Sequence, residues 1–278
     1  MNRPMKSAPL SKALTSFTAV IVTGGSSGIG KSFIEVMQTL QPDLRFCNLS
    51  RREPALKSVG LKLRHIPCDL ARPSAIVQGA ESVLDWLKTD VPAGRILLIN
   101  NSGFGAYGHF PEPNLAHQLE MLDVNVRAVV DLTARLLPVL KARGGAVITV
   151  ASTAAFQPTA YMAAYGASKA FVLHWSLALN EELRGTEVRT LAVCPGPTPT
   201  EFFKRAGLQE GSVSDALGTT SEAVVLSSLR ALAAGRAQVV PGWKNKVGAA
   251  LVTKLPKPMA AWLAAKVLAR FRLKKVSG

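Results

Sequence analysis

The chain has 278 residues, of which 48% are hydrophobic and only 18% are charged, so one sizeable core is expected and long disorder is not. A formal net charge of +15 favours anionic partners such as phosphorylated cofactors, acidic lipid surfaces or nucleic acid. The sequence has no basic stripe with interleaved aromatic residues and no apolar window of membrane-spanning length. We therefore expect no specific nucleic-acid binding and no membrane span.

Strand-like apolar runs alternate with helix-like segments along the chain. Strands are predicted at residues 19–23, 44–49, 63–67, 96–100, 146–151, 188–194 and 237–240. Helices are predicted at residues 29–40, 73–88, 115–140 and 163–184. This alternation predicts a single-domain α/β fold, a Rossmann-like doubly wound parallel sheet of about seven strands with helices on both faces.

The predicted organisation has three parts. Residues 1–18 form a flexible N-terminal arm, residues 19–241 the α/β domain, and residues 242–278 a basic, partly amphipathic helical tail. Residues 195–220 are rich in Pro, Gly and Thr and follow a strand, which is typical of a substrate loop.

The tail carries apolar residues at helical spacing, Leu263, Val267 and Phe271, among basic residues. This pattern fits an amphipathic helix on an anionic membrane surface, but a terminal helix packed on the domain or on a partner subunit, with a solvated basic edge, is the favoured interpretation. Three cysteines without paired spacing indicate buried thiols in a reducing compartment. The first 18 residues lack the apolar stretch of a secretory signal, so we expect a cytoplasmic protein that is peripheral to the membrane if the tail binds lipid.

A glycine-rich segment, Thr-Gly-Gly-Ser-Ser-Gly-Ile-Gly at residues 23–30, joins the first predicted strand to the first predicted helix. Glycines let the backbone approach a pyrophosphate closely, and the helix N-terminus offers free amides and the positive end of a dipole. The residues expected to bind phosphate are Gly24, Ser26, Ser27, Gly28, Ile29 and Gly30.

The second predicted strand ends in Asn48-Leu49-Ser50-Arg51-Arg52, without an acidic residue. Sites for the unphosphorylated dinucleotide usually place an acid here to hold the ribose hydroxyls. Arg51 instead offers a charge partner for a 2′-phosphate, so NADP(H) is the predicted cofactor. The alternative is that both arginines are solvated surface residues.

Tyr165 and Lys169 stand four residues apart in the predicted helix 163–184, which places them on one face. A nearby ammonium lowers the pKa of a phenol, which makes this pair a usable proton donor and acceptor. Ser152 follows the fifth predicted strand, where its hydroxyl can bind a carbonyl oxygen or simply cap a turn. Asn125 lies in the predicted helix 115–140, and an asparagine in this apolar stretch indicates a backbone or water contact unless it is exposed.

The order of these motifs resembles that of the short-chain dehydrogenase/reductase family. The resemblance covers about residues 18–205 and rests on the glycine loop, Cys68-Asp69-Leu70, Asn100-Asn101-Ser102-Gly103, Asn125, Ser152, Tyr165-Gly166-Ala167-Ser168-Lys169 and Pro195-Gly196. Ser102 departs from the family, which usually has alanine there, and we expect only a small local adjustment.

The resemblance implies an NADP(H)-dependent oxidoreductase that interconverts a ketone and a secondary alcohol, with hydride from the nicotinamide and a proton from Tyr165. It implies a catalytic set of Asn125, Ser152, Tyr165 and Lys169, in which Asn125 holds a water in a proton relay to Lys169. Cofactor contacts beyond the glycine loop and Arg51 are implied for Asp69, Asn101, Tyr165, Lys169, Pro195, Gly196, Thr198 and Thr200.

The resemblance also implies a homodimer or homotetramer. The tail is loosely similar to that of bacterial family members that act on acyl chains, so a carbonyl reductase or 3-oxoacyl reductase with an apolar substrate is expected. Two other classes stay open, a non-catalytic dinucleotide-binding regulator and a basic protein that binds membranes or nucleic acid. The intact Ser152, Tyr165 and Lys169 count against the regulator. The four histidines lack metal-ligand spacing, so no metal site is expected.

Overall fold

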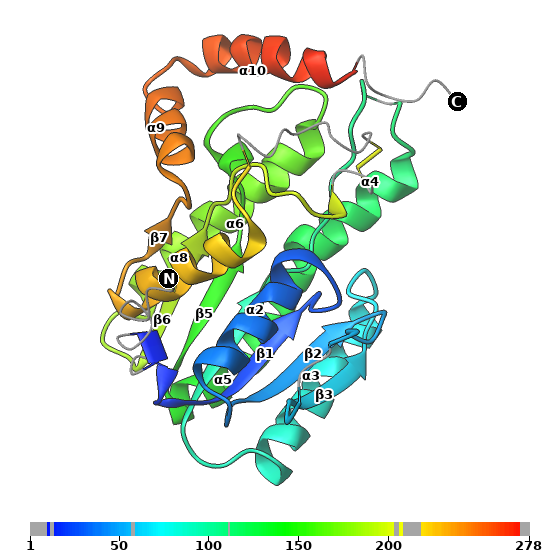
Figure 1. Ribbon diagram of the computed structural model, residues 1–278. Coiled ribbons are helices and arrows are strands. Elements are labelled where there is room, and N and C mark those ends of the chain that lie inside the picture. Colours follow the sequence, from blue (N-terminus) through cyan, green and yellow to red (C-terminus); the bar gives the residue numbers. More distant parts are fainter. Residues whose placement is uncertain are drawn as a thin grey trace.

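The structure is a computed structural model, and it describes residues 10–11, 14–56, 59–110, 112–202, 206–207 and 218–272. Within these residues a parallel sheet of seven strands runs in the order β3-β2-β1-β4-β5-β6-β7, with helices on both faces (Figure 1). The strands are β1 (Phe17–Thr23), β2 (Arg45–Ser50), β3 (Lys62–Pro67), β4 (Arg95–Asn100), β5 (Gly145–Val150), β6 (Val188–Val193) and β7 (Gln238–Val239). The predicted single-domain, doubly wound α/β fold is confirmed.

The central strands are apolar on both faces, as expected where helices cover both sides of a parallel sheet. In β1, Ala19 and Ile21 pack into one core layer, and Val20 and Val22 pack into the other. All four side chains are fully buried. This explains why β1 reads as a continuous apolar run rather than an alternating one.

Two layers of helices cover the sheet. Helices α2 (Gly28–Leu40) and α8 (Ser221–Ala233) contact each other and contribute to the core layer that holds Val20. Helices α3 (Pro73–Thr89) and α5 (Ala128–Arg143) pack together in the opposite layer, where α6 (Ala163–Glu182) also contributes. The sequence predicts no helix at α8, which begins where the Thr220 hydroxyl accepts a hydrogen bond from the amide of Ala223 at 3.2 Å.

The single helix predicted at residues 115–140 is in fact interrupted. Helix α4 (Leu115–Leu122) and helix α5 are separated by a π-helical turn at Asp123–Arg127. The carboxamide of Asn125, inside this turn, is paired with the backbone of Phe104: it accepts from the amide at 3.2 Å and donates to the carbonyl at 3.0 Å. These two bonds fix the wider turn, a distortion that often occurs at functional sites.

The described part of the predicted N-terminal arm packs on the domain. Strand β1 begins at Phe17, two residues before the predicted start, and Leu10 and Leu14 are buried in the same core layer as α2. The hydroxyl of Ser11 donates to the carbonyl of Leu40 at 3.0 Å. The boundary at residue 18 is therefore too late, while residues 1–9 and 12–13 of the predicted arm lie outside the described residues.

The tail contains two helices, α9 (Trp243–Val252) and α10 (Lys257–Arg272), which pass over one end of the domain (Figure 1). The predicted stripe of Leu263, Val267 and Phe271 falls within α10. Among the residues that the structure describes, no helix has the length and apolar character required to cross a bilayer.

Candidate active site

A cavity of about 1120 Å³ extends from the glycine loop to the tail helices. It is lined by the segments that follow β1, β2, β4, β5 and β6, and so it lies at the carboxyl ends of the strands. The sheet order reverses between β1 and β4, which is where ligands bind in open α/β sheets. The cavity is therefore the candidate active site.

The glycine loop has the backbone that a bound pyrophosphate requires. Gly24 and Gly28 have φ values of +69° and +55°, in the left-handed region that favours glycine. A Cβ atom at Gly24 would lie 2.7 Å from the Ser102 hydroxyl oxygen, so only glycine fits against this neighbour. The hydroxyl at Ser102, where the family usually has alanine, is thus accommodated by close packing on the loop.

The N-terminus of α2 is arranged to receive an anion. Its N-cap residue, Ser27, makes no side-chain capping bond, and the first turn carries no acidic residue. Ser26, Ser27 and Ile29 line the cavity here together with Gly24 and Gly28. These features fit the phosphates of a dinucleotide.

Gly30, the sixth predicted phosphate residue, does not line the cavity. It is buried, and a Cβ atom there would collide with the Gly24 carbonyl and the Asn101 carboxamide. Asn101 itself lines the cavity, but its side-chain amide donates to the Thr23 carbonyl at 3.0 Å. Both residues therefore hold the loop in shape.

Sequence reasoning missed a second support of the loop. The buried Asn48, in β2, accepts a hydrogen bond from the Gly25 amide at 2.7 Å. A polar residue between the apolar Cys47 and Leu49 of a buried strand is the signal that indicates such a role.

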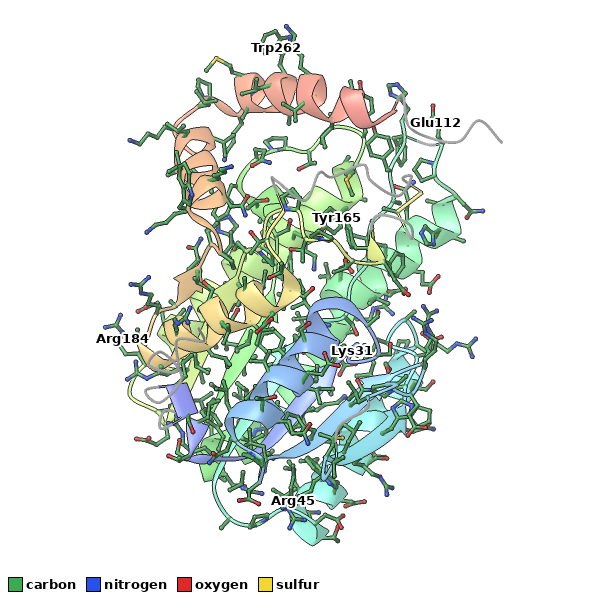
Figure 2. The ribbon with its side chains drawn as sticks, viewed as in Figure 1. Lys31, Arg45, Glu112, Tyr165, Arg184 and Trp262 are labelled. Carbon is green, nitrogen blue, oxygen red and sulfur yellow. The ribbon has the colours of Figure 1, made fainter. Side chains whose placement is uncertain are left out.

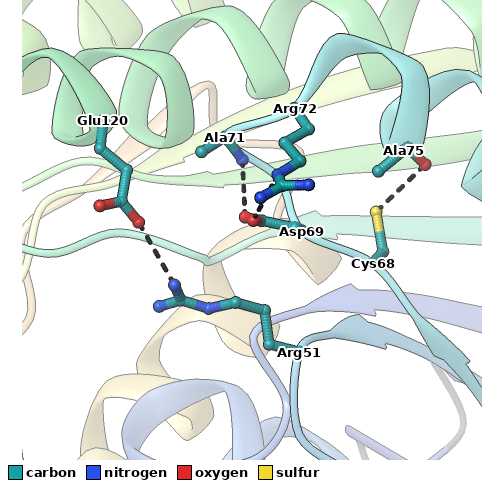
Figure 3. A network of polar contacts seen from close by, with 7 residues as sticks. All are labelled: Arg51, Cys68, Asp69, Ala71, Arg72, Ala75 and Glu120. Atoms are coloured by element: carbon teal, nitrogen blue, oxygen red, sulfur yellow. Dashed lines mark hydrogen bonds and ion pairs between the residues drawn. The ribbon is translucent and has the colours of Figure 1, made fainter.

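The far end of the cavity carries charged residues that pair with one another (Figure 3). Arg51 Nη1 lies 3.3 Å from Glu120 Oε1, an acid on α4 that the sequence analysis did not single out. Asp69 accepts a hydrogen bond from the Ala71 amide at 3.2 Å and forms an ion pair with Arg72 at 3.4 Å. Arg51, Asp69 and Glu120 all line the cavity, so any ligand phosphate at Arg51 has to compete with Glu120.

Tyr165 and Lys169 point to the same side of α6, into the middle of the cavity. The Tyr165 side chain is hydrogen-bonded to Ser152, and its ring centroid lies 5.2 Å from that of Phe202. Lys169 Nζ is 5.9 Å from the Tyr165 ring centroid and donates to the Val150 carbonyl at 2.9 Å. The structure thus brings the predicted Ser152, Tyr165 and Lys169 together.

Burial controls the ionisation of this pair. Desolvation raises the pKa of Tyr165 to about 12, and the hydrogen bond with Ser152 offsets only part of the change. Desolvation also lowers the pKa of Lys169 to about 8. The expected lowering of the phenol pKa by the ammonium is wrong, because loss of hydration outweighs an amine that is bonded to a backbone carbonyl. Tyr165 therefore carries its proton at neutral pH.

Asn125 does not line the cavity but lies directly behind it, only 1% exposed. Its amide donates to the Ser168 hydroxyl at 3.1 Å as well as to Phe104. A Cβ atom at Gly103 would lie 3.0 Å from Asn125 Oδ1 and 3.1 Å from Lys169 Nζ, so the two polar groups approach the same point. The proposed water relay between them stays a prediction.

The residues predicted to lie beside a nicotinamide, Pro195, Gly196, Thr198 and Thr200, all line the cavity. Gly196 is covered by Asn245 of α9, whose carboxamide would collide with any Cβ atom at that position. Asn245 also donates to the Pro241 carbonyl at 3.0 Å. Sequence reasoning did not detect this contact between the tail and the loop after β6. Residues 203–205 and 208–217 of the predicted substrate loop, Phe203 among them, lie outside the described residues.

The described residues contain no cluster of His, Cys, Asp or Glu that could hold a metal ion. The three cysteines are buried free thiols, and burial raises the pKa of Cys47 and Cys194 to about 12 and that of Cys68 to about 11. None of these thiols is therefore a reactive thiolate at neutral pH.

A sequence model of the short chain dehydrogenase family matches residues 18–211. The chain belongs to the short-chain dehydrogenase family. This confirms the resemblance seen in the motifs and makes the protein a member of a family of oxidoreductases.

Individual proteins are similar to this chain over most of the domain. The ketoacyl reductase HetN of Nostoc sp. is 32% identical over 186 residues, which are 64% of this chain and 62% of HetN. The serine 3-dehydrogenase of Agrobacterium fabrum is 29% identical over 201 residues, 69% of this chain and 78% of that enzyme. The structure of a short-chain dehydrogenase from Sphingobium yanoikuyae in complex with NADPH is 25% identical, with a TM-score of 0.71 over 87% of this chain and 97% of that one. The chain thus spans less than two thirds of HetN.

Proposed function

We propose that this protein is an NADP(H)-dependent oxidoreductase that interconverts a ketone and a secondary alcohol. The observation that carries the proposal is that Ser152, Tyr165 and Lys169 line one cavity with the glycine loop. The cofactor supplies the hydride, and the protein supplies position and proton transfer. The alternative of a non-catalytic regulator gains no support from the site, because each of these polar side chains faces the cavity.

Each catalytic side chain has a distinct task. Tyr165, protonated because burial raises its pKa to about 12, donates its proton to the carbonyl oxygen during reduction. Ser152, already hydrogen-bonded to Tyr165, holds that oxygen in place. Lys169 would bind the ribose beside the nicotinamide, while Asn125 fixes the turn behind it and would position a water for proton return. In this protonation state Tyr165 has the proton that reduction requires.

The preference for NADP(H) is proposed to come from Arg51, which lines the cavity where no acid follows β2. Arg51→Ala is expected to reduce the ratio of NADPH to NADH affinity at least tenfold, about 1.4 kcal/mol. Glu120→Gln, which removes the competing carboxylate 3.3 Å from Arg51, should instead strengthen NADPH binding about two- to fivefold. Fluorescence titration with both cofactors measures the ratio. Equal affinity of the unmodified protein for NADPH and NADH would refute the assignment of Arg51.

The substrate is proposed to be apolar or acyl-chain-like. Beyond Tyr165 the cavity is lined mainly by Met162, Phe202, Val252, Leu263 and Leu268, with Lys244 as the charged residue contributed by the tail. This lining suits an acyl chain, as in the relative named ketoacyl reductase, better than a zwitterionic amino acid such as serine.

A series of ketones and 3-oxoacyl thioesters of increasing chain length tests both the reaction and the substrate class. NADPH oxidation should give kcat/KM values that rise by roughly three- to fourfold for each CH₂ group that the cavity buries, until the chain fills the cavity. A decline with chain length, or a preference for 3-oxo amino acids, would contradict the proposed substrate. No turnover with any carbonyl compound would overturn the function.

We further propose that the protein is cytoplasmic and forms a homodimer or homotetramer, as the family resemblance implies. Contact with an anionic membrane through the tail is the remaining proposal, and it is developed below from the tail helices.

A further inference from the structure

Helices α9 and α10 form one wall of the cavity. Ala249 and Val252 of α9 line it, and so do Ala260, Ala264 and Leu268 of α10. The three α10 residues recur every four positions, so they share one helix face. Ala260 is only 1% exposed, which shows that this inner face is packed on the domain.

Polar contacts anchor both helices over the site. The Tyr107 hydroxyl donates to the Leu268 carbonyl at 2.7 Å, and Lys257 Nζ donates to the Phe156 carbonyl at 3.4 Å. Asn245 is fixed against the loop at Gly196, next to the proposed nicotinamide position. The tail is therefore a fixed cap of the active site and not a loose appendage.

The outer face of the cap is apolar and exposed. Seven of the twelve large hydrophobic residues that are exposed in the described chain lie on these two helices. They are Trp243, Val247 and Leu251 on α9, and Met259, Trp262, Leu263 and Val267 on α10. Trp243 is 73% exposed and Trp262 is 57% exposed, and Figure 2 shows Trp262 pointing outward from α10 while Tyr165 lies in the body of the protein beneath it. A concentration of this kind marks an interaction surface.

The charge of the tail identifies its partner. From Trp243 to Gly278 the sequence has nine Lys and Arg residues and no acidic residue. Lys266 Nζ lies 3.8 Å from the centroid of the Trp262 ring, and Lys244 Nζ lies 6.0 Å from that of Trp243. Exposed tryptophan beside lysine, on a surface segment without acidic residues, is a composition that binds the headgroup region of anionic lipid.

A second copy of the chain is a poorer partner for the same face. A two-fold interface would bring this uncompensated positive charge against itself, and cores of protein interfaces are depleted in lysine. An anionic lipid surface satisfies both the apolar residues and the cations.

Two residues connect the outer face with the cavity. Leu263 and Val267 both line the cavity, yet they are 43% and 51% exposed. The cavity therefore has an apolar mouth beside α10 at these two residues.

We propose that α9 and α10 dock the protein on an anionic lipid surface and that an apolar carbonyl compound passes from the lipid into the cavity beside Leu263 and Val267. This inference rests on the proposed reduction and assigns it a membrane-dissolved substrate.

Docking is tested with the full chain and vesicles of phosphatidylcholine with or without phosphatidylglycerol. We expect the protein to bind the anionic vesicles at least tenfold more tightly than pure phosphatidylcholine, as measured by co-sedimentation. Salt at 0.5 M should weaken this binding, because it screens the attraction between the lipid and about five lysines. The double variant Trp262→Ser/Leu251→Ser should lose at least tenfold in vesicle binding, because both side chains are exposed and neither lines the cavity. Phe171→Ser is the matched control, since Phe171 is 45% exposed on α6, and it should bind vesicles like the unmodified chain.

Turnover then tests the route of the substrate. The double variant should reduce a water-soluble ketone at the normal rate and lose most activity on a long-chain ketone presented in anionic vesicles. Absence of vesicle binding, or equal binding by the double variant, overturns the proposal. A change of oligomeric state in the double variant without an effect on vesicle binding overturns it as well and assigns the face to a subunit interface. Vesicle binding without turnover on any carbonyl compound would overturn the proposed function and the substrate route, because sedimentation is read independently of activity.

Discussion

Tyr165→Phe is expected to lower kcat for ketone reduction by a factor of about 10² to 10⁴ while changing NADPH affinity by no more than about threefold. The substitution removes one oxygen and leaves the ring, which packs in the core and lies 5.2 Å from Phe202. Ser152 keeps a partner because its hydroxyl also accepts from the Ala154 amide at 3.1 Å. The loss should therefore reflect the missing proton donor and not a collapsed site.

Tyr161→Phe is the matched control for this loss. Tyr161 precedes α6, and its ring contacts His109 and Tyr107, but it does not line the cavity. Its variant should retain turnover within a factor of about two, and both variants should have melting temperatures close to that of the unmodified protein. Turnover by Tyr165→Phe within a factor of three of the unmodified enzyme would show that another group donates the proton.

Much of the fold can be predicted because local patterns determine it. The strands at the centre of the sheet are runs of buried aliphatic residues, and the glycine loop lies between strand and helix as expected. Helix α8 was missed because its sequence, Ser-Glu-Ala-Val-Val-Leu-Ser-Ser, follows a Pro- and Gly-rich segment and has only a weak apolar periodicity. The π turn at Asn125 was missed because a backbone contact with Phe104, distant in sequence, fixes it.

The site shows the same division between local and long-range information. The order of the motifs was sufficient to predict that Ser152, Tyr165 and Lys169 belong to one site, and all three line the cavity. Glu120 beside Arg51 and Asn245 above Gly196 could not be predicted, since neither belongs to a motif and each contact joins separate parts of the chain. The direction of the Tyr165 pKa shift was mispredicted because it is the balance of burial and charge, and burial is known only from the structure.

That balance leads to a second large effect, a gain of stability on loss of the catalytic amine. Lys169→Met should abolish most turnover yet raise the melting temperature by about 2–6 °C at pH 7. Burial lowers the pKa of Lys169 from 10.5 to about 8, so the folded state holds the proton less firmly than the unfolded state does. The burial of the charged amine costs on the order of 3 kcal/mol of folding free energy. The variant also loses the hydrogen bond to the Val150 carbonyl, which reduces its gain in stability by about 1 kcal/mol.

The pH dependence of this gain has a definite sign. The cost is fully present below pH 8, where Lys169 is charged in both states, and it vanishes above pH 10.5, where it is neutral in both. The advantage of Lys169→Met in thermal denaturation should therefore be largest at pH 7 and mostly gone by pH 10. The buried thiols of Cys47 and Cys68 destabilise the fold at high pH in both proteins, so they cancel in the difference. The Cys194 thiolate loses the attraction of Lys169 in the variant, which adds to the decline of the advantage at high pH. Lys88→Met is the control, because this side chain is 76% exposed on α3, and its stability should show no such trend with pH. If the stability advantage of Lys169→Met stayed constant or grew with pH, the amine of Lys169 would not be desolvated at the centre of the site.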